Sequence, residues 1–334
     1  MNCRATPVAL ALVGVLAMGN WAQGEERVST FKPFVRGDIF VAATIMDHPT
    51  DDHMGTGRIF QYDAGLNLKG ELYTRGTTHK IGGLNFAPDG TLWAFAQGMP
   101  AVVEIGVDGV QKPVRRFSDR SLSSVTFGTD GSLYFGEHLQ GTNTRIPTNT
   151  TVFNLLPGRD VIGDGNIFRF GPDAVLLQEF HSDTHGGVVG IHGVTSTVLA
   201  DKDTRMIYVS ETGNRVMQYD LANDRQLPDL RVFDDDENVF MVLTLMPMLD
   251  GSLLISTGNG LVVLDPDSGE TLRFYDLESP GWAASGPTVD GEGIVVGNFF
   301  TGDVVIISRE TGEVVLSSNI GQRNSLSGVA QFPG

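Results

Sequence analysis

The sequence is poor in cysteine, in long apolar runs and in basic residues. Its 334 residues contain one cysteine, Cys3. The rest of the chain therefore has no thiol for catalysis, for a disulfide or for a thiolate-bound metal. Lys and Arg number 23 against 40 Asp and Glu, which gives a formal net charge of −17. Because so acidic a chain repels nucleic acid and anionic lipid, we expect neither as a partner.

One apolar run stands near the N-terminus, from Val8 to Met18. It is too short to span a bilayer, and Arg4 precedes it, while Ala22-Gln23-Gly24 follows with the small-x-small form of a cleavage site. Cys3 precedes the run and is not placed for lipid attachment. We expect residues 1–24 to be a cleaved signal peptide, residues 25–334 to form one domain, and the protein to be secreted or periplasmic without membrane insertion. The alternative is an uncleaved or buried helix.

Glycine, in contrast, is abundant, with 42 residues. The stretch from Ile207 to Leu221 is typical of the chain: two short segments rich in β-branched and aromatic residues, joined by a turn at residues 211–215. A unit of two strands cannot bury its own apolar face, so it should recur along the chain.

The pattern recurs in six units, each with an inner strand, an Asp-Gly-type turn, a second strand, a third strand and an outer strand. A period of roughly 40–50 residues with four strands is typical of a β-propeller. We predict an all-β, six-bladed β-propeller with four antiparallel strands per blade, and we place the inner strand of the sixth unit at residues 287–289. The Asp-Gly pairs at residues 89, 130, 250 and 290 occupy equivalent places, which indicates turn chemistry before ligand binding.

The two ends of the chain predict how the ring closes. The first unit lacks an inner strand, and the C-terminal residues 327–334 resemble the inner-strand segment 83–88. We therefore expect the C-terminal strand to pair beside residues 39–43 and remove the free sheet edges. A loop insertion at about residues 139–164 is long enough to cover a binding site, or to hide a seventh blade.

In a propeller, the loops that follow the second strands surround one mouth of the central channel, a default ligand site. The residues that end the second strands are Ala43, Ala96, Glu137, Glu211, Thr257 and Asn298. We predict a divalent metal held by Glu137, Glu211, Asn298 and His192. Oxygen donors suit Ca²⁺, Mg²⁺ or Mn²⁺, while several imidazoles would draw Zn²⁺ or Fe²⁺, and we expect Ca²⁺ first. Alternatively, these residues solvate the mouth or tie blades together.

Imidazoles near the same mouth are candidates for moving a proton, because their pKa lies near neutrality. They are His138, His192 and His185. His181 and His185 belong to one loop cluster of His and Asp, and residues 48–53 form a second. Each cluster could reach the mouth or could be a solvated loop.

At the level of its repeats, the chain resembles the NHL-type propellers and the regucalcin/gluconolactonase-like family. The resemblance is carried by residues 210–216 (SETGNRV), 83–90 (GLNFAPDG) and 192–194 (HGV). It implies a divalent cation in the channel and hydrolysis of lactones or esters. That family holds its ion with a Glu, two Asn and an Asp, and His192 stands here where one Asn is expected.

Three classes of function follow. The first is a metal-assisted hydrolase or lyase for a lactone-like or ester-like small molecule bound in the channel mouth, in which the metal polarises a carbonyl. The second is a non-catalytic exported scaffold that binds a protein or a glycan through aromatics such as Trp93, Trp282 or Phe299. The third, a redox or cofactor-holding propeller, has no haem-attachment motif to support it.

Overall fold

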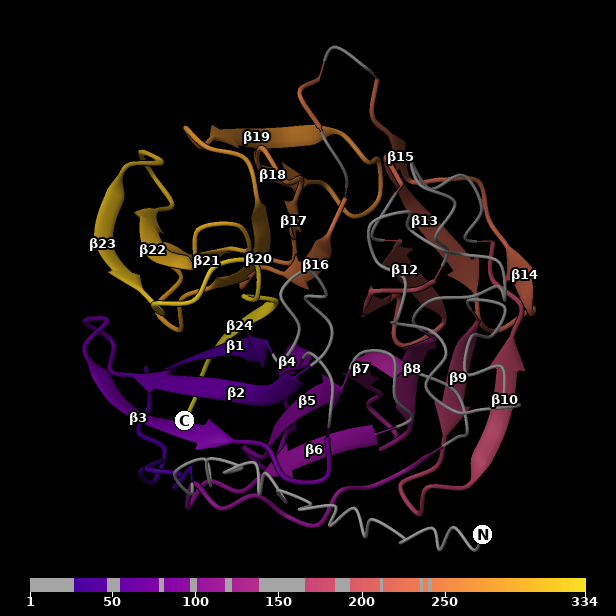
Figure 1. Cartoon of the computed structure of the whole chain (residues 1–334). Helices are drawn as coiled ribbons and strands as arrows, with labels where there is room; N and C mark the ends of the chain where they lie inside the picture. Colours follow the sequence, from indigo (N-terminus) through magenta and orange to yellow (C-terminus); the bar gives the residue numbers. More distant parts are fainter. Residues whose placement is uncertain are drawn as a thin grey trace, which may run out of the picture.

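The computed structural model of the chain describes residues 27–46, 55–77, 81–96, 101–117, 122–137, 166–183, 193–210, 213–234, 237–239 and 242–334. Within these ranges every regular element is a β-strand, and the strands form six antiparallel sheets. The sheets are arranged as blades around a common axis (Figure 1). The prediction of an all-β, six-bladed propeller is confirmed.

Each blade runs from an inner strand at the axis to an outer strand at the periphery. Blade 1 contains β24 (Gly328–Gln331), β1 (Ile39–Met46), β2 (Gly55–Tyr62) and β3 (Leu68–Tyr73); blade 2 contains β4 (Ile81–Phe86), β5 (Leu92–Ala96) and β6 (Ala101–Ile105); blade 3 contains β7 (Leu122–Phe127), β8 (Leu133–Glu137), β9 (Ile167–Phe170) and β10 (Leu176–Phe180). Blade 4 contains β11 (Ser196–Ala200), β12 (Arg205–Val209) and β13 (Arg215–Asp220), with β14 (Arg225–Gln226) and β15 (Arg231–Val232) both paired to β13; blade 5 contains β16 (Thr244–Pro247), β17 (Leu253–Ser256), β18 (Gly260–Leu264) and β19 (Thr271–Asp276); blade 6 contains β20 (Trp282–Pro287), β21 (Gly293–Asn298), β22 (Asp303–Ser308) and β23 (Val314–Asn319).

The ring closes through its two ends, as predicted. β24 pairs antiparallel with β1, from Ile39 opposite Gln331 to Ala42 opposite Gly328. The six inner strands then contact one another in a closed circle, in the order β24, β4, β7, β11, β16, β20 and back to β24. The pairing with β24 means that β1 does not present an unpaired edge.

The core lies between neighbouring blades, and the two faces of each sheet belong to different interfaces. In β1, Ile39 and Val41 pack with side chains of blade 6, while Phe40 and Ala42 pack with side chains of blade 2. Both faces of the second strands are therefore buried. This is why those strands appear in the sequence as continuous apolar runs rather than as alternating ones.

Polar side chains connect the inner part of every blade to the next blade. We call the following set the interblade belt: Ser327 Oγ to Ile81 O, Asn85 Nδ2 to Val125 O (2.6 Å), Thr126 Oγ1 to Thr197 O (2.8 Å), Ser196 Oγ to Leu245 O (2.7 Å), Ser256 Oγ with Ser285 Oγ (2.8 Å), and Val289 N to Gln331 Oε1 (2.7 Å). Because these hydrogen bonds join different sheets, they add to the apolar packing that holds the blades side by side. Each contributes about 1 kcal/mol by the usual measure.

Three strands differ from the sequence prediction. The inner strand of blade 6 is Trp282–Pro287 rather than residues 287–289, because Thr288 already belongs to the following turn, where it accepts the Gly291 N–H. Ser285 therefore lies in mid-strand instead of at the strand entrance, and it is buried.

The outer strands of blades 2 and 4 are also broken, and each contains a proline. In blade 2 only bridges at Gln111 and Arg115 remain, on either side of Pro113. In blade 4, Pro228 lies between β14 and β15. Proline has no N–H to donate to a ladder, so it interrupts pairing and protects an edge from further pairing.

The aspartates of the Asp-Gly turns have the structural role that the sequence predicts. Asp89, Asp130, Asp250 and Asp290 each accept the backbone N–H of the residue two positions later, at 2.8–3.1 Å. The following glycines have φ between +75° and +86°, a region that favours glycine. These carboxylates are parts of hairpin turns, and their hydrogen bonds lower their pKa values.

The segment that precedes β1 covers the outer edge of blade 1 and is anchored by a buried ion pair. Thr30 N donates to Glu71 O on β3 at 2.7 Å. Asp38, which is almost completely buried, accepts hydrogen bonds from Lys69 Nζ (2.7 and 2.5 Å), Gln61 Nε2 (2.8 Å) and Val35 N (3.0 Å). Asp38 thus joins the lead-in segment to β2 and β3.

Candidate functional site

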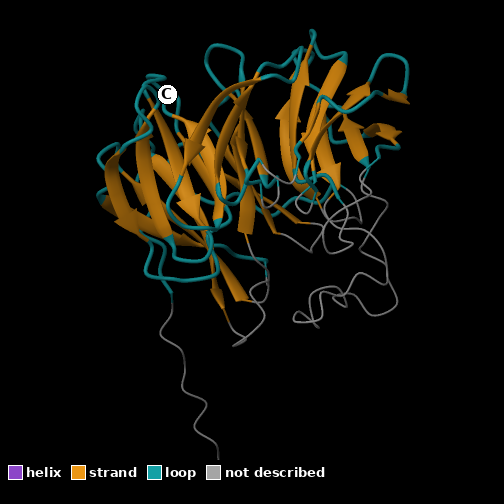
Figure 2. Cartoon of the chain, turned by 90° about the horizontal axis from the view of Figure 1, so that it is seen from above, coloured by secondary structure: helices purple, strands orange, loops and turns teal. Residues whose placement is uncertain are grey.

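The propeller has two faces, which differ in the loops they carry (Figure 2). On one, which we call the turn face, inner strands end and the Asp-Gly turns lie. On the other, which we call the mouth face, second strands end and inner strands begin. Of the predicted site residues, Glu137 and Asn298 are described, and both end second strands on the mouth face. His138, His185, His192, Glu211 and the cluster at residues 48–53 lie outside the described residues, as do the predicted signal peptide and the insertion at 139–164.

Glu137 is the last residue of β8 and has no exposed surface. Its Oε2 accepts the backbone N–H of Asn166 at 3.0 Å, and its own N–H donates to Asn166 O at 2.9 Å. The carbonyl of Glu137 accepts the Val194 N–H at 2.7 Å, which joins blade 3 to the entrance of blade 4. The carboxylate is therefore held in a fixed orientation at the mouth-side end of blade 3.

Further polar side chains continue outward from Glu137 along the same end of blade 3. Asn166 Nδ2 donates to Glu179 Oε1 at 2.8 Å and lies 3.3 Å from His181 Nδ1. We call Glu137, Asn166, Glu179 and His181 the blade 3 polar strip. It contains two carboxylates, an amide and an imidazole, so it has the groups needed to bind polar atoms and to move protons.

Two members of this strip, Asn166 and Glu179, are not among the residues predicted from the sequence. Asn166 directly precedes the third strand and Glu179 belongs to the outer strand, whereas the predicted ligands lie at the ends of second strands and at an inner-strand entrance. A signal was present: Asn166 directly precedes β9, and Glu179 lies two residues before His181. Strand pairing places Glu179 opposite Phe168, within reach of Asn166.

The segment after His181 is attached to blade 4 through Tyr208. The Tyr208 hydroxyl can donate its one hydrogen to Asp183 O (2.8 Å) or to Gln226 Oε1 (2.9 Å), and Asp183 N donates to the same Gln226 oxygen at 3.1 Å. Burial raises the pKa of Tyr208 well above its ordinary value near 10, so the phenol remains a donor. The strip is thereby fixed to both blades 3 and 4.

Asn298 ends β21, has no exposed surface and is engaged in the local backbone. Its Oδ1 accepts the N–H groups of Phe300 (2.9 Å) and Thr301 (3.1 Å), and its Nδ2 donates to Pro280 O (3.0 Å). A Cβ at Gly281 would lie 2.7 Å from that Oδ1, so the packing here depends on glycine. Asn298 thus holds the β21–β22 turn to the entrance of blade 6.

The mouth-face ends of blades 6 and 1 carry buried polar atoms that have no hydrogen-bond partner. Among the described residues there are four such side-chain atoms, and three of them lie here: Thr44 Oγ1, Ser325 Oγ and Trp282 Nε1. Thr44 is in β1, Ser325 precedes β24 and Trp282 begins β20. Buried donors are almost always paired in native proteins, so such groups point to a ligand or an ordered water.

The donor chemistry can be compared with what a metal needs. Carboxylate oxygens are the ligands that Ca²⁺ prefers, and Glu137 fits that requirement. Asn298 would have to give up two backbone hydrogen bonds to present its oxygen to an ion. Within the described ranges, no group of three or more His, Cys, Asp or Glu side chains is placed to hold a metal. Glu211 and His192, the other two predicted ligands, are not among those ranges.

The described part of the chain contains no helix of the length and apolarity that a bilayer crossing requires. Taken with the geometry above, the structure defines a six-bladed β-propeller whose mouth face contains the fully buried Glu137 carboxylate.

The comparisons with known proteins support the fold. No protein-family model and no curated protein matches the sequence. A chain from the crystal structure of a nidogen/laminin complex superposes with a TM-score of 0.59 at 10% identity, covering 88% of this chain and 97% of that chain. A protein of unknown function from Bacteroides caccae gives 0.60 at 13% identity, covering 90% of this chain and 100% of the other.

A third structure, virginiamycin B lyase from Staphylococcus aureus, gives a TM-score of 0.48 at 12% identity, covering 73% of this chain and 71% of that one. At such identities structural likeness shows the fold alone, and it does not assign a function.

Proposed function

We propose that this propeller binds a small molecule at its mouth face and acts on it as a hydrolase or lyase with the help of a divalent metal ion, with lactones and esters as the substrate class. The observation that carries the proposal is the Glu137 carboxylate, which is fully buried at the mouth-side end of blade 3 and oriented by the Asn166 N–H. A buried carboxylate is costly to maintain, and such groups concentrate at functional sites.

Glu137 is the described residue that would hold the ion, with Glu211 and His192 as the further ligands that the sequence predicts. When bound, a divalent ion polarises a carbonyl oxygen and lowers the pKa of water. The chain's own contribution is orientation and proton transfer. Asn166 and Glu179 fix the strip around Glu137, and His138, His185 and His192 are the imidazoles that we assign to moving a proton.

The buried donors of blades 6 and 1 support a polar ligand at the same face. Thr44, Ser325 and Trp282 would donate hydrogen bonds to oxygen atoms of such a ligand, which a lactone or an ester provides.

The test is elemental analysis of the purified protein by mass spectrometry after incubation with Ca²⁺, Mn²⁺ or Zn²⁺. We expect a stoichiometric metal in the wild type, and its loss in Glu137→Gln and Glu211→Gln. Glu71→Gln is the matched control, because Glu71 pairs with Arg58 on the outer part of blade 1. Circular dichroism would check that each variant is folded. A wild-type protein without metal after all three incubations would overturn the metal-dependent reaction; metal binding would justify a screen of lactones and esters.

A second candidate function is a non-catalytic scaffold that binds another protein. Trp93 and Trp282, which the sequence offered as contact residues, are buried in the core, so they do not form an exposed surface. The observation that favours this candidate is instead the set of exposed apolar side chains on the outer strands of blades 5 and 6. One structural neighbour also comes from a complex between two proteins, nidogen and laminin.

A further inference from the structure

The outer strand of blade 6, β23, is an open sheet edge with an unusual composition. It contains no charged residue, and three consecutive apolar side chains are exposed: Val314 (56%), Val315 (56%) and Leu316 (38%). In the described structure, β23 pairs only with β22, so its other edge presents unpaired backbone groups. Natural proteins usually protect such edges, because these pair readily with another strand.

Most of the other outer edges show that protection, and β10 of blade 3, on which Leu176 and Leu177 are exposed, carries the charged Glu179. The edge of β3 is covered by the lead-in segment through Thr30, and those of blades 2 and 4 are interrupted by Pro113 and Pro228. The strand β19 carries the charged residues Arg273 and Asp276. Among the described residues, the edge of β23 has no covering segment, no proline and no charge; its pairing with β22 shifts register at Val315.

A groove of about 800 Å³ adjoins β23 on the turn face. Leu316 lines it from β23, Ile306 from β22 and Ala64 from the neighbouring blade 1. Leu316 is paired opposite Ile306, so the two side chains lie on the same face of the sheet, toward blade 1. The groove therefore offers apolar contacts to alternate side chains of any strand added to the edge of β23.

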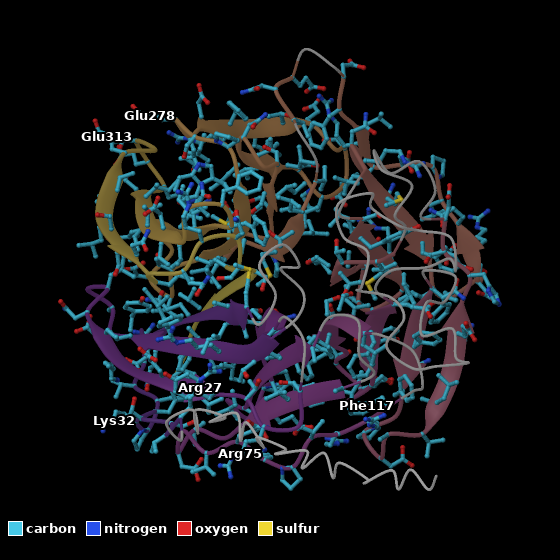
Figure 3. All side chains as sticks on the ribbon, viewed as in Figure 1. Arg27, Lys32, Arg75, Phe117, Glu278 and Glu313 are labelled. Atoms are coloured by element: carbon cyan, nitrogen blue, oxygen red, sulfur yellow. The ribbon has the colours of Figure 1, made fainter. Side chains whose placement is uncertain are left out.

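The charges around this edge are mainly acidic. Four exposed carboxylates belong to the groove or to the β22–β23 turn: Asp290, Glu292, Glu310 and Glu313. Glu313 lies at the periphery of blade 6 (Figure 3). The two arginines that line the groove are already engaged, since Arg309 pairs with Asp250 and Arg273 donates to the Glu310 carbonyl.

We propose that β23 is a docking edge for an extended segment of a partner protein that carries alternating apolar residues flanked by Lys or Arg. The segment adds as a further strand to blade 6. Its backbone hydrogen-bonds to β23, its alternate apolar side chains enter the groove beside Leu316, and its basic residues face Glu310 and Glu313. This mode of binding gives affinity through the main chain and selectivity through the alternate side chains. It goes beyond the catalytic proposal and gives the scaffold candidate a specific surface.

The test uses a fluorescent peptide in which Val and Thr alternate between terminal Lys residues, and a second peptide with Glu at both ends. Fluorescence anisotropy measures binding of each to the full-length chain. We expect the basic peptide to bind, and Leu316→Lys to weaken it by about tenfold or more, because a charge would enter the apolar groove. The matched control is Leu272→Lys on β19, where the leucine is also an exposed residue of an outer strand. This variant should bind as the wild type does.

Two further measurements complete the test. Amide hydrogen exchange of β23 should slow when the basic peptide binds, and Glu310→Gln with Glu313→Gln should reduce its affinity toward that of the acidic peptide. Glu137→Gln should leave peptide binding unchanged, which separates this site from the mouth-face proposal. The proposal would be overturned by any of three results: the two peptides bind equally well, Leu316→Lys binds the basic peptide as tightly as the wild type does, or the basic peptide does not bind. If the wild type does not bind the peptide but forms a dimer, and Leu316→Lys converts that dimer to a monomer, the edge of β23 would instead be assigned to pairing with a second copy of the chain.

Discussion

Replacing Asp38 by alanine should lower the free energy of unfolding by about 3–5 kcal/mol, because the change leaves a cation and two neutral donors without their acceptor. The Lys69 ammonium loses a charge-assisted bond, worth roughly 1.5–3 kcal/mol, and the Gln61 amide and the Val35 N–H lose about 1 kcal/mol each. The Lys69 side chain is 23% exposed and can partly reach water, which places the expected loss near the lower end, about 3 kcal/mol.

The assay is urea denaturation followed by far-ultraviolet circular dichroism. The control is Arg225→Ala, which removes the ion pair between the exposed Arg225 side chain and Asp220 and should cost much less than Asp38→Ala. Asp38→Ala combined with Lys69→Met should cost less than Asp38→Ala alone, since no ammonium is then stranded. The assignment of Asp38 as the anchor of the lead-in segment would be refuted by either of two results. Asp38→Ala could lower the free energy of unfolding by no more than Arg225→Ala does, or the double variant could lose as much as the two single variants together.

Three further predictions concern the turns and the buried phenols. Hydrogen bonds from Ser252, and then the Arg309 charge, lower the pKa of Asp250 to about 2. The stability that the ionised carboxylate contributes at neutral pH should therefore decline as the pH falls from about 4 toward 2. Melting temperatures measured across this range test the prediction, and Asp250→Asn should flatten the decline. Burial, and then the hydrogen bond to Asp224, raise the pKa of Tyr219 to about 12. The stability that the neutral phenol contributes should therefore be fully present below a pH of about 10 and be lost as the pH rises through 12. Melting temperatures should fall in step with the rise of the tyrosinate absorbance. Gly269→Ala should prevent folding or cost several kcal/mol, because φ is +70° and the new Cβ would lie 2.0 Å from the carbonyl oxygen of Leu230. Gly251→Ala has φ of +86° but no atom within 4 Å of the new Cβ, so it should cost only about 1–2 kcal/mol in the same denaturation assay.

The fold could be predicted because the signals that specify it are local and repeated. Each Asp-Gly turn sets a hairpin by its own side-chain hydrogen bond, so Asp89 and Asp290 mark equivalent places without knowledge of the rest of the chain. Ring closure was predictable for a similar reason: the segment after Ser327 repeats the inner-strand pattern of blade 2, and one missing strand had to be supplied. The predicted start of β20 was wrong, because the segment that begins at Trp282 and includes Ser285 does not have the composition typical of a strand.

The site was predictable only in part, because the use of a side chain depends on its neighbours in space. Aligning the units placed Glu137 and Asn298 at the ends of second strands, where the structure also has them, with both side chains buried. The sequence could not show that Asn298 is held by two N–H groups of its own turn, nor that Asn166 joins Glu137 to Glu179. Those contacts depend on loop geometry and on pairing between strands far apart in sequence.

The interblade belt has a consequence for how the chain could be rearranged. Every junction in the ring, including the one formed by the chain ends, has a hydrogen bond that joins a polar side chain of one blade to the neighbouring blade. The fold should then depend less on the order in which the chain connects the blades than on the completion of the six-bladed ring. New termini opened at the turn-face hairpin of another blade, with a linker joining the present ends, should give a circular permutant with the same ring.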